Sequence, residues 1–210
     1  MSRASRIALL GAAAIFAAVF TSQLSAQRAD KASGQTIFRF DTFGDEQLWT
    51  DVLRMHEVIA TVSPKTALSV GLKVDVEALP ATVVAALRDG QVNLDDPAVT
   101  LELLRLNAVV GIIGKIDDTG RLVSVGTTCA LCHSTVDNSF ASGIGRRLDG
   151  WPNRDLNAGV ILGLSPALAA FKEEFAAWGP GKYDPRHHAF DGSNLISLNS
   201  PSLPVLIPPA

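Results

Sequence analysis

The sequence predicts a mainly α-helical chain that contains one short β-hairpin. Three observations predict this fold class: apolar residues recur at helical spacing over 46–62, two later segments carry helix-capping residues, and only one pair of apolar runs is joined by a polar turn. We expect residues 1–26 to be an export signal, residues 27–108 a helical extension, and residues 109–210 a second domain.

The composition is that of a globular protein. The chain has 210 residues, of which 47% are hydrophobic, with 18 basic and 21 acidic residues. No cluster of Lys and Arg is present, so we expect no nucleic-acid partner. The two cysteines allow at most one disulfide, which excludes a disulfide-stapled fold.

The first 26 residues have the pattern of a secretory signal. Arg3 and Arg6 precede an apolar run over 7–20, and Ala26 suits a cleavage site. An uncleaved anchor helix is the alternative, but 14 apolar residues are fewer than the roughly 20 that cross a bilayer. We therefore expect an exported protein, periplasmic in a bacterium, without a stable membrane anchor; removing two arginines leaves a formal charge of −5.

The first expected helix covers 46–62 and ends before Pro64. Its apolar stripe consists of Trp49, Leu53, His56 and Ala60. Residues 67–78 alternate weakly between apolar and polar, so we expect a strand or an extended loop there.

Two short helices are predicted by their first residues. Pro80 favours a helix over 81–88, because proline is accepted in the first helical turn. Asp96 is a good N-cap for a helix that begins at Pro97.

The second half combines the hairpin with one further helix. Residues 109–125 form two apolar runs around the polar turn 117–120, which predicts a β-hairpin. Ser165 followed by proline predicts a helix that continues through Trp178. Residues 181–210 are expected to be loop-like.

The residues that carry the chemistry are Cys129, Cys132 and His133, in the sequence C-A-L-C-H. Two cysteines three residues apart lie on one turn of backbone, where both thiols can form thioether bonds to the vinyl groups of one haem. The adjacent imidazole can then bind the iron on its proximal side. The motif predicts one covalently attached haem c per chain.

Three other interpretations of the cysteine pair are open. A dithiol redox site would follow a thioredoxin-like strand and precede a helix, and it leaves His133 unexplained. A zinc site needs about four ligands, from a chain with only two Cys and four His. A structural disulfide is the third, since exported proteins retain disulfides.

The motif resembles that of the c-type cytochromes. The residues before it are also loosely similar to the first haem segment of bacterial dihaem peroxidase-like cytochromes, through Gly114-Lys115, Asp117, Arg121-Leu122 and Gly126-Thr127-Thr128. The resemblance implies a cytochrome c-like haem domain over 109–210. The chain departs from those enzymes in carrying a single C-x-x-C-H, which lies mid-chain.

The second axial ligand of the iron is not evident from the sequence. Small cytochromes c place a methionine well after the motif, whereas the only methionines here, Met1 and Met55, precede it. The candidate distal ligands are His56, Met55, His187 and His188. A haem iron without a second protein ligand is a further alternative. A haem that lacks a thioether ligand is expected to have a lower potential or an open face.

Arg146, Arg147 and Trp151 are candidate partners of the haem propionates, because they offer N–H donors to carboxylates. The alternative for this Gly-rich segment is an ordinary solvated turn.

The favoured function is one-electron transfer by an electron carrier, with a redox partner that the sequence does not identify. A peroxide- or oxygen-reactive haem protein with an open sixth position is the first alternative. A haem-based sensor or an assembly subunit is the second.

Overall fold

The computed structural model describes residues 33–184 and 203–210. The chain divides into two compact units, Met1–Phe38 and Arg39–Ala210. In the first unit the described residues are helical, and the expected export signal lies outside the described part. In the described ranges no helix is long and apolar enough to span a bilayer. The labelled helices and strands all belong to the second unit.

The fold is mixed α/β, so the prediction of a mainly α-helical, cytochrome c-like fold is wrong. Of the described residues, 41% are helical and 18% are in strands. The strands pair two by two. The pairs are β1 (Val74–Asp75) with β5 (Ile144–Gly145), β2 (Ile112–Ile116) with β3 (Leu122–Thr127), β4 (Ser134–Val136) with β6 (Arg147–Asp149), and β7 (Lys182–Tyr183) with β8 (Val205–Leu206). Most of them are two or three residues long, too short to produce a periodic pattern, which is why the sequence does not predict them.

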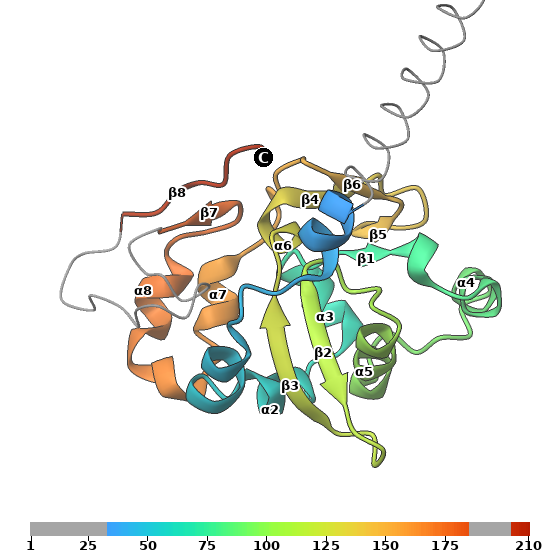
Figure 1. Ribbon diagram of the computed structural model, residues 1–210, viewed down its shortest axis with the longest axis horizontal. Coiled ribbons are helices and arrows are strands. Elements are labelled where there is room, and N and C mark those ends of the chain that lie inside the picture. The colour runs from blue at the N-terminus through green and yellow to red at the C-terminus, as the bar shows by residue number, and fades with distance from the viewer. Residues whose placement is uncertain (1–32, 185–202) are drawn as a thin grey trace, which may run out of the picture. The chain divides into compact units, whose positions relative to one another are not determined.

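The central element is the hairpin of β2 (Ile112–Ile116) and β3 (Leu122–Thr127), which pair antiparallel (Figure 1). It confirms the hairpin expected over 109–125. The turn is held by Asp117, whose Oδ1 accepts the backbone N–H groups of Thr119 at 2.9 Å and Arg121 at 3.0 Å. Such side-chain bonds are the reason Asp favours turns.

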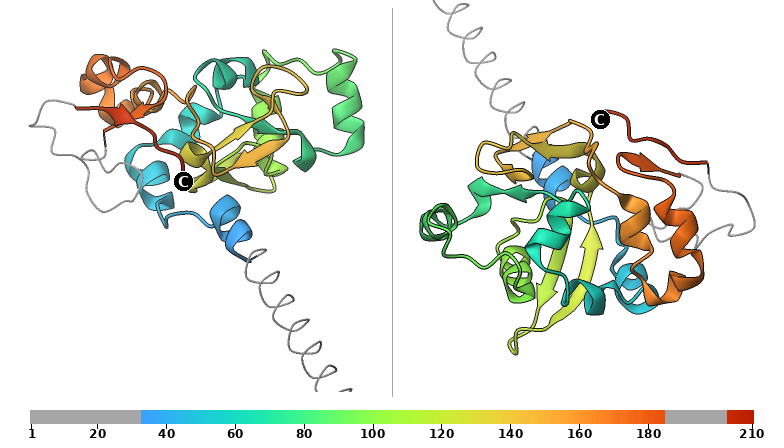
Figure 2. Two further views of the ribbon diagram at one scale, coloured as in Figure 1. Left: turned by 90° about the horizontal axis from the view of Figure 1, so that it is seen from above. Right: turned by 180° about the vertical axis from the view of Figure 1, so that it is seen from behind.

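Two of the expected helices are confirmed. They are α4 (Ala81–Arg88) and α5 (Pro97–Arg105), and the Asp96 side chain caps α5 by accepting the Ala98 N–H at 2.9 Å. Both views of Figure 2 place these green helices on the opposite side of the hairpin from the orange α7 (Ala158–Leu162) and α8 (Lys172–Ala176).

The prediction of a single helix over 46–62 is wrong. The structure instead has a π-helical turn, η1 (Leu48–Val52), and a separate helix, α2 (Met55–Ile59). Arg54 between them has φ of 54°, in the left-handed region, which interrupts the helical path. Its guanidinium pairs with the Glu57 carboxylate at 2.6 Å, so the break is bridged on the surface.

Pro64 begins a helix instead of ending one. The Ser63 hydroxyl accepts the Thr66 N–H at 3.3 Å and caps α3 (Pro64–Ser69). The rest of the weakly alternating segment forms β1 (Val74–Asp75) and the 3-10 turn η2 (Val76–Ala78). β1 pairs in parallel with β5 (Ile144–Gly145), after the hairpin in sequence.

The C-terminal third contains short helices and one more strand pair. Ser165 caps its helix as expected, but the segment divides into a 3-10 helix and an α-helix. Residues expected to be loop-like form the antiparallel pair β7 and β8. The bounds are α7 (Ala158–Leu162), η3 (Pro166–Phe171), α8 (Lys172–Ala176), β7 (Lys182–Tyr183) and β8 (Val205–Leu206).

One hydrophobic core joins residues from both sides of position 108, the boundary expected between extension and second domain. Leu53 and Leu104 lie in it with Leu156, Leu162 and Phe175, each at most 1% exposed. Burying a side chain of this size stabilises a fold by roughly 1.5–3 kcal/mol. The core therefore supports the cysteine motif from residues on both sides of that boundary.

Candidate cofactor site

The cysteine motif forms a single helical turn, α6 (Ala130–His133), at the end of β3 (Figure 1). The Thr128 hydroxyl accepts the Ala130 N–H at 3.3 Å and donates to the Arg39 carbonyl at 3.2 Å. The His133 N–H donates to the Cys129 carbonyl at 3.1 Å and closes the turn. The structure therefore holds Cys129, Cys132 and His133 on one turn, as their spacing predicts.

Two backbone hydrogen bonds join this turn to the segment after β6. The Gly150 N–H donates to the His133 carbonyl and the Asn153 N–H to the Cys132 carbonyl, both at 2.9 Å. Asn153 is itself buried, and its side-chain amide donates to the Gly71 carbonyl at 2.9 Å. These bonds satisfy carbonyls at the end of a helix, where no intrahelical partner exists.

A polar network fixes the strand that leaves the turn. β4 (Ser134–Val136) pairs antiparallel with β6 (Arg147–Asp149). The Ser134 hydroxyl donates to Asp149 Oδ1 at 2.9 Å, and Arg39 Nε donates to Asp149 Oδ2 at 2.7 Å. Because Ser134 is fully buried and the ion pair only partly exposed, this network restricts the motion of the residues that follow His133.

The strand that enters the turn is fixed by a buried carboxylate. Asp45 is 1% exposed and accepts the Thr127 N–H at 3.0 Å and the Thr127 hydroxyl. Burial raises the pKa of Asp45, although both bonds from Thr127 act in the opposite direction. Asp45 therefore holds Thr127, two residues before Cys129.

A backbone carbonyl group orients the imidazole of His133. Its Nδ1 lies 3.1 Å from the carbonyl oxygen of Pro208. A carbonyl oxygen only accepts, so this contact requires a proton on Nδ1, which in the neutral imidazole leaves the lone pair on Nε2. Metal-binding histidines commonly donate their second N–H to a backbone carbonyl in this way.

An apolar groove of about 550 Å³ lies along the motif turn. The C-terminal tail forms its other wall, held by the β7–β8 pair and by a bond from the Ala210 N–H to the Gly150 carbonyl at 3.2 Å. Three of its side chains are large, apolar and exposed: Phe43 at 47%, Val205 at 54% and Leu206 at 59%. The groove is lined by Phe43, Thr128, Cys129, Leu131, Cys132, His133, Tyr183, Val205, Leu206, Ile207 and Pro208.

The two thiols are free. Burial, reinforced by the neighbouring Cys129, raises the pKa of Cys132 to about 12. Cys132 is therefore a protonated thiol at neutral pH, unlike the low-pKa nucleophile of a dithiol oxidoreductase. In residues 33–184 and 203–210, no three His, Cys, Asp or Glu side chains gather as a metal site would require.

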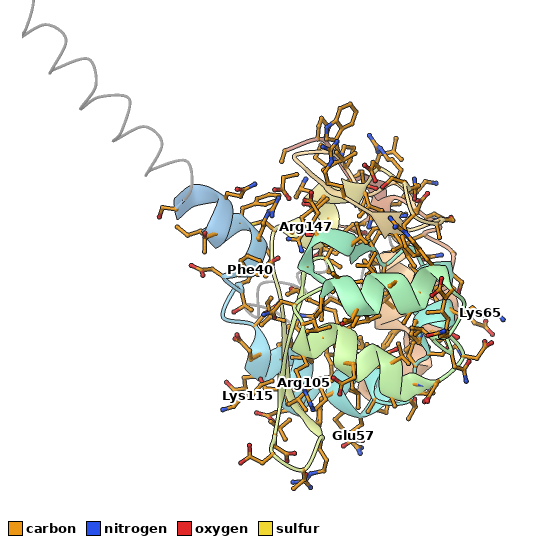
Figure 3. The ribbon with its side chains drawn as sticks, turned by 90° about the vertical axis from the view of Figure 1, so that its right-hand side faces the viewer. Phe40, Glu57, Lys65, Arg105, Lys115 and Arg147 are labelled. Carbon is orange, nitrogen blue, oxygen red and sulfur yellow. The ribbon has the colours of Figure 1, made fainter. Side chains whose placement is uncertain are left out.

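None of the three residues expected to bind propionates lines the groove. Arg147 is buried, with Nε 3.1 Å from Asp75 Oδ2 but too misaligned for a hydrogen bond, and its guanidinium lies 5.7 Å from the Phe40 ring (Figure 3). Arg146 is exposed, with Nε 3.6 Å from Asp137 Oδ2, and Trp151 is 64% exposed. Their role toward a propionate stays a prediction.

Two of the candidate distal ligands, Met55 and His56, are among the described residues, and neither lines the groove. Met55 is buried and lines a separate interior cavity. His56 Nε2 lies 4.0 Å from Glu57 Oε1, and neither residue lines the groove. His187 and His188 lie outside the described residues.

Of the eleven residues that line the groove, the sequence predicts only Cys129, Cys132 and His133 as site residues. The other eight are Phe43, Thr128, Leu131, Tyr183, Val205, Leu206, Ile207 and Pro208. Pro208 contributes a main-chain carbonyl, for which no residue type is diagnostic. The run Leu-Pro-Val-Leu-Ile-Pro-Pro is apolar, but nothing in it indicates that it packs on a turn 75 residues earlier.

Comparisons with protein-family models, curated proteins and solved structures each give no match.

Proposed function

We propose that this chain is an exported c-type haem protein that carries single electrons. In this proposal one haem is attached through Cys129 and Cys132, and His133 binds its iron. The observation that carries the proposal is the orientation of His133, whose Nδ1–H is held by the Pro208 carbonyl beside an apolar groove.

The residues present fit a haem. Two thiols and one imidazole with an available Nε2 lie on a single turn. The groove next to them is apolar and falls within the usual 300–1,000 Å³ of ligand sites. Exposed Phe43, Val205 and Leu206 would lose contact with water under a flat apolar ligand, which favours binding by roughly 25 cal/mol per Å² covered.

The chain's own residues have separable roles in this proposal. Each thiol adds its S–H across one vinyl double bond, so that attachment consumes no oxidant. The Pro208 carbonyl keeps the Nδ1 proton in place and makes Nε2 the better electron donor. When bound, the haem would supply reversible one-electron iron chemistry.

Exposure of the groove favours a carrier. Val205 and Leu206 are more than half exposed along one wall, so a cofactor held there would lie close to the surface, where a partner protein can approach. The proposal therefore includes a redox partner protein but does not identify it.

A second candidate is a haem protein with an open sixth position that reacts with peroxide or oxygen. The observation in its favour is that, of the described residues lining the groove, only His133 is a histidine and none is a methionine. Tyr183 is the remaining side chain there of a type that binds haem iron in some proteins.

The first experiment measures covalent attachment. The full chain is produced in bacteria with and without the machinery for haem c maturation. The purified protein is then denatured and its mass is measured by mass spectrometry. We expect one haem per chain only where that machinery is present. Cys129→Ala and Cys132→Ala should each leave one thioether, and His133→Ala should load poorly. A mass equal to that of the haem-free mature chain in competent cells would overturn the proposal.

The second experiment separates carrier from catalyst in the loaded protein. A carrier should bind carbon monoxide and cyanide slowly or not at all and titrate reversibly with one electron. Rapid stoichiometric binding of both, with peroxide turnover from an artificial donor, would instead support the open site. His56→Ala tests that candidate ligand, because its loss should make ligand binding faster only if His56 binds the iron.

A further inference from the structure

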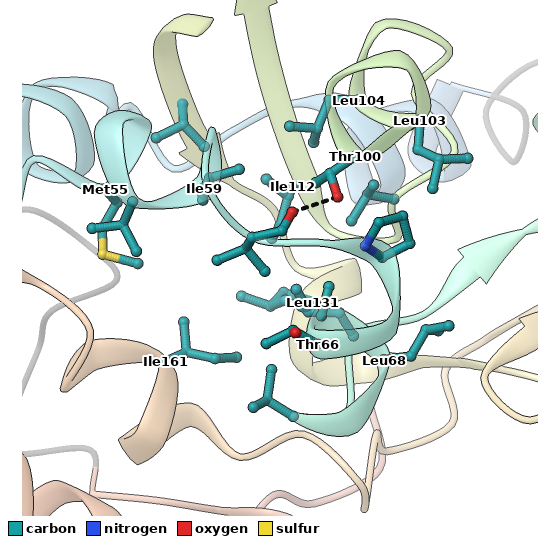
Figure 4. Close-up of a pocket in the computed structure, with 18 of the residues that line it drawn as sticks. Met55, Ile59, Thr66, Leu68, Thr100, Leu103, Leu104, Ile112, Leu131 and Ile161 are labelled. Carbon is teal, nitrogen blue, oxygen red and sulfur yellow. Dashed lines mark hydrogen bonds between the residues drawn. The ribbon is translucent and has the colours of Figure 1, made fainter. Parts of the chain in front are cut away.

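An interior apolar cavity of about 80 Å³ lies behind the motif turn (Figure 4). Helices α2, α3, α5 and α7 and both strands of the hairpin contribute to its wall. The side chains labelled around it in the figure include Met55, Ile59, Leu103, Ile112, Leu131 and Ile161. The surface that faces the cavity is apolar throughout.

The hydroxyl and ammonium groups of the wall already have partners. The Thr100 hydroxyl donates to the Val62 carbonyl at 2.6 Å, and the Thr127 hydroxyl donates to Asp45. The Lys73 ammonium pairs with the Asp155 carboxylate at 2.5 Å. A water molecule needs two to four polar partners in a buried site, so it gains little from entering this cavity.

The size of the cavity restricts its occupant. A volume of about 80 Å³ is several times the 10–15 Å³ needed to hold one water molecule. It is smaller than the engineered apolar cavity of about 150 Å³ that stays dry and binds benzene or xenon. The occupant that fits is therefore one small apolar molecule, such as a diatomic gas or a xenon atom.

The cavity shares walls with two other apolar spaces. Leu131 lines both the cavity and the groove of the cysteine motif. Four further residues, Pro64, Leu68, Val74 and Leu103, line both the cavity and a second space of about 180 Å³ next to α4. Single layers of side chains thus separate the cavity from both neighbours, and one of these neighbours is the groove that His133 lines.

We propose that the cavity behind Leu131 is a binding site for one small apolar gas molecule. Binding of a gas molecule in the cavity depends only on the size and the apolar wall of the cavity. The further consequence, that such a molecule would be held one side chain away from the groove in which a haem would bind, rests on the proposed haem function.

Xenon is the probe for this site. Methyl NMR spectra of the full mature chain are recorded at increasing xenon pressure. We expect saturable shifts in the methyl groups of Ile59, Leu131 and Ile161, and none in exposed Val52. Absence of saturation, or equal shifts at Val52, would overturn the proposal.

A matched pair of variants localises the effect. Ile59→Phe fills the cavity, whereas Ile113→Phe makes the same change at another partly buried isoleucine that does not line it. We expect xenon shifts to disappear in the first variant and persist in the second. If Ile59→Phe does not fold, Ile161→Phe replaces it, and retention of the Leu131 shift in a folded filling variant would refute the site.

The same titration on a Cys129→Ser, Cys132→Ser double variant separates this proposal from the haem assignment. That variant cannot hold haem covalently, but its cavity is intact. Xenon shifts that persist there support the cavity site even if the wild-type chain proves to carry no haem, and their loss there counts against it.

Discussion

Replacing Gly111 by alanine tests whether the cysteine turn requires close backbone contact from the start of the hairpin. Gly111 has φ of +80°, and a Cβ added to it would overlap the backbone of Leu131 and lie 2.6 Å from the Leu131 Cβ. Ordinary contact begins at 3.4 Å. The two segments must therefore separate by more than 0.8 Å, because the Leu131 backbone atoms are nearer to the added Cβ than the Leu131 Cβ is. We expect a left-handed φ penalty of about 1–2 kcal/mol plus an overpacking cost of about 1–3 kcal/mol.

The control for this variant is Gly120→Ala in the turn of the same hairpin. Gly120 has φ of +84°, but beyond its chain neighbours a Cβ added there would meet no atom within 4 Å. It should therefore lose only the backbone penalty of about 1–2 kcal/mol. The assay is urea unfolding followed by tryptophan fluorescence, with haem loading in maturation-competent cells as a second measurement. Equal destabilisation and equal loading of the two variants would refute the proposed dependence of the turn on Gly111.

Two further predictions concern ionisable groups near the turn. Burial raises the pKa of Asp45 above 3.8, so the folded chain keeps this proton to higher pH than the unfolded chain, and unfolding free energy should fall as pH rises above about 4. Urea melts from pH 4 upward should show this decline relative to Asp45→Asn; a difference that rises with pH would contradict it. Burial also raises the pKa of Cys132 to about 12, so iodoacetamide should label it slowly at about pH 8 in the folded, haem-free chain. Labelling as fast as in the denatured chain would disprove this protection.

Local signals in the sequence predict the elements that depend on local bonds. Asp96 caps α5 through its neighbour Ala98, and Asp117 organises the hairpin turn through Thr119 and Arg121. The C-x-x-C-H spacing likewise predicts a single turn, because it needs only five consecutive residues. These features are accessible because each is determined within a few positions of the chain.

The features that the sequence does not predict depend on distant partners or on backbone conformation. Arg54 is an ordinary helix-forming residue, and nothing in its identity indicates the left-handed conformation that divides the helix expected over 46–62. The wall of the groove is equally inaccessible, because Pro208 meets His133 through a carbonyl that every residue possesses. Sequence patterns therefore locate the reactive residues but not their surroundings.

The contact between His133 and Pro208 also implies an order of events in time. The two residues are 75 positions apart, and a ribosome adding roughly 5–20 residues per second makes the second about 4–15 seconds after the first. During that interval the residues of the motif turn have been made but Pro208 has not, so the groove cannot yet form. Of the described chain, the groove is therefore among the last features that can form during synthesis.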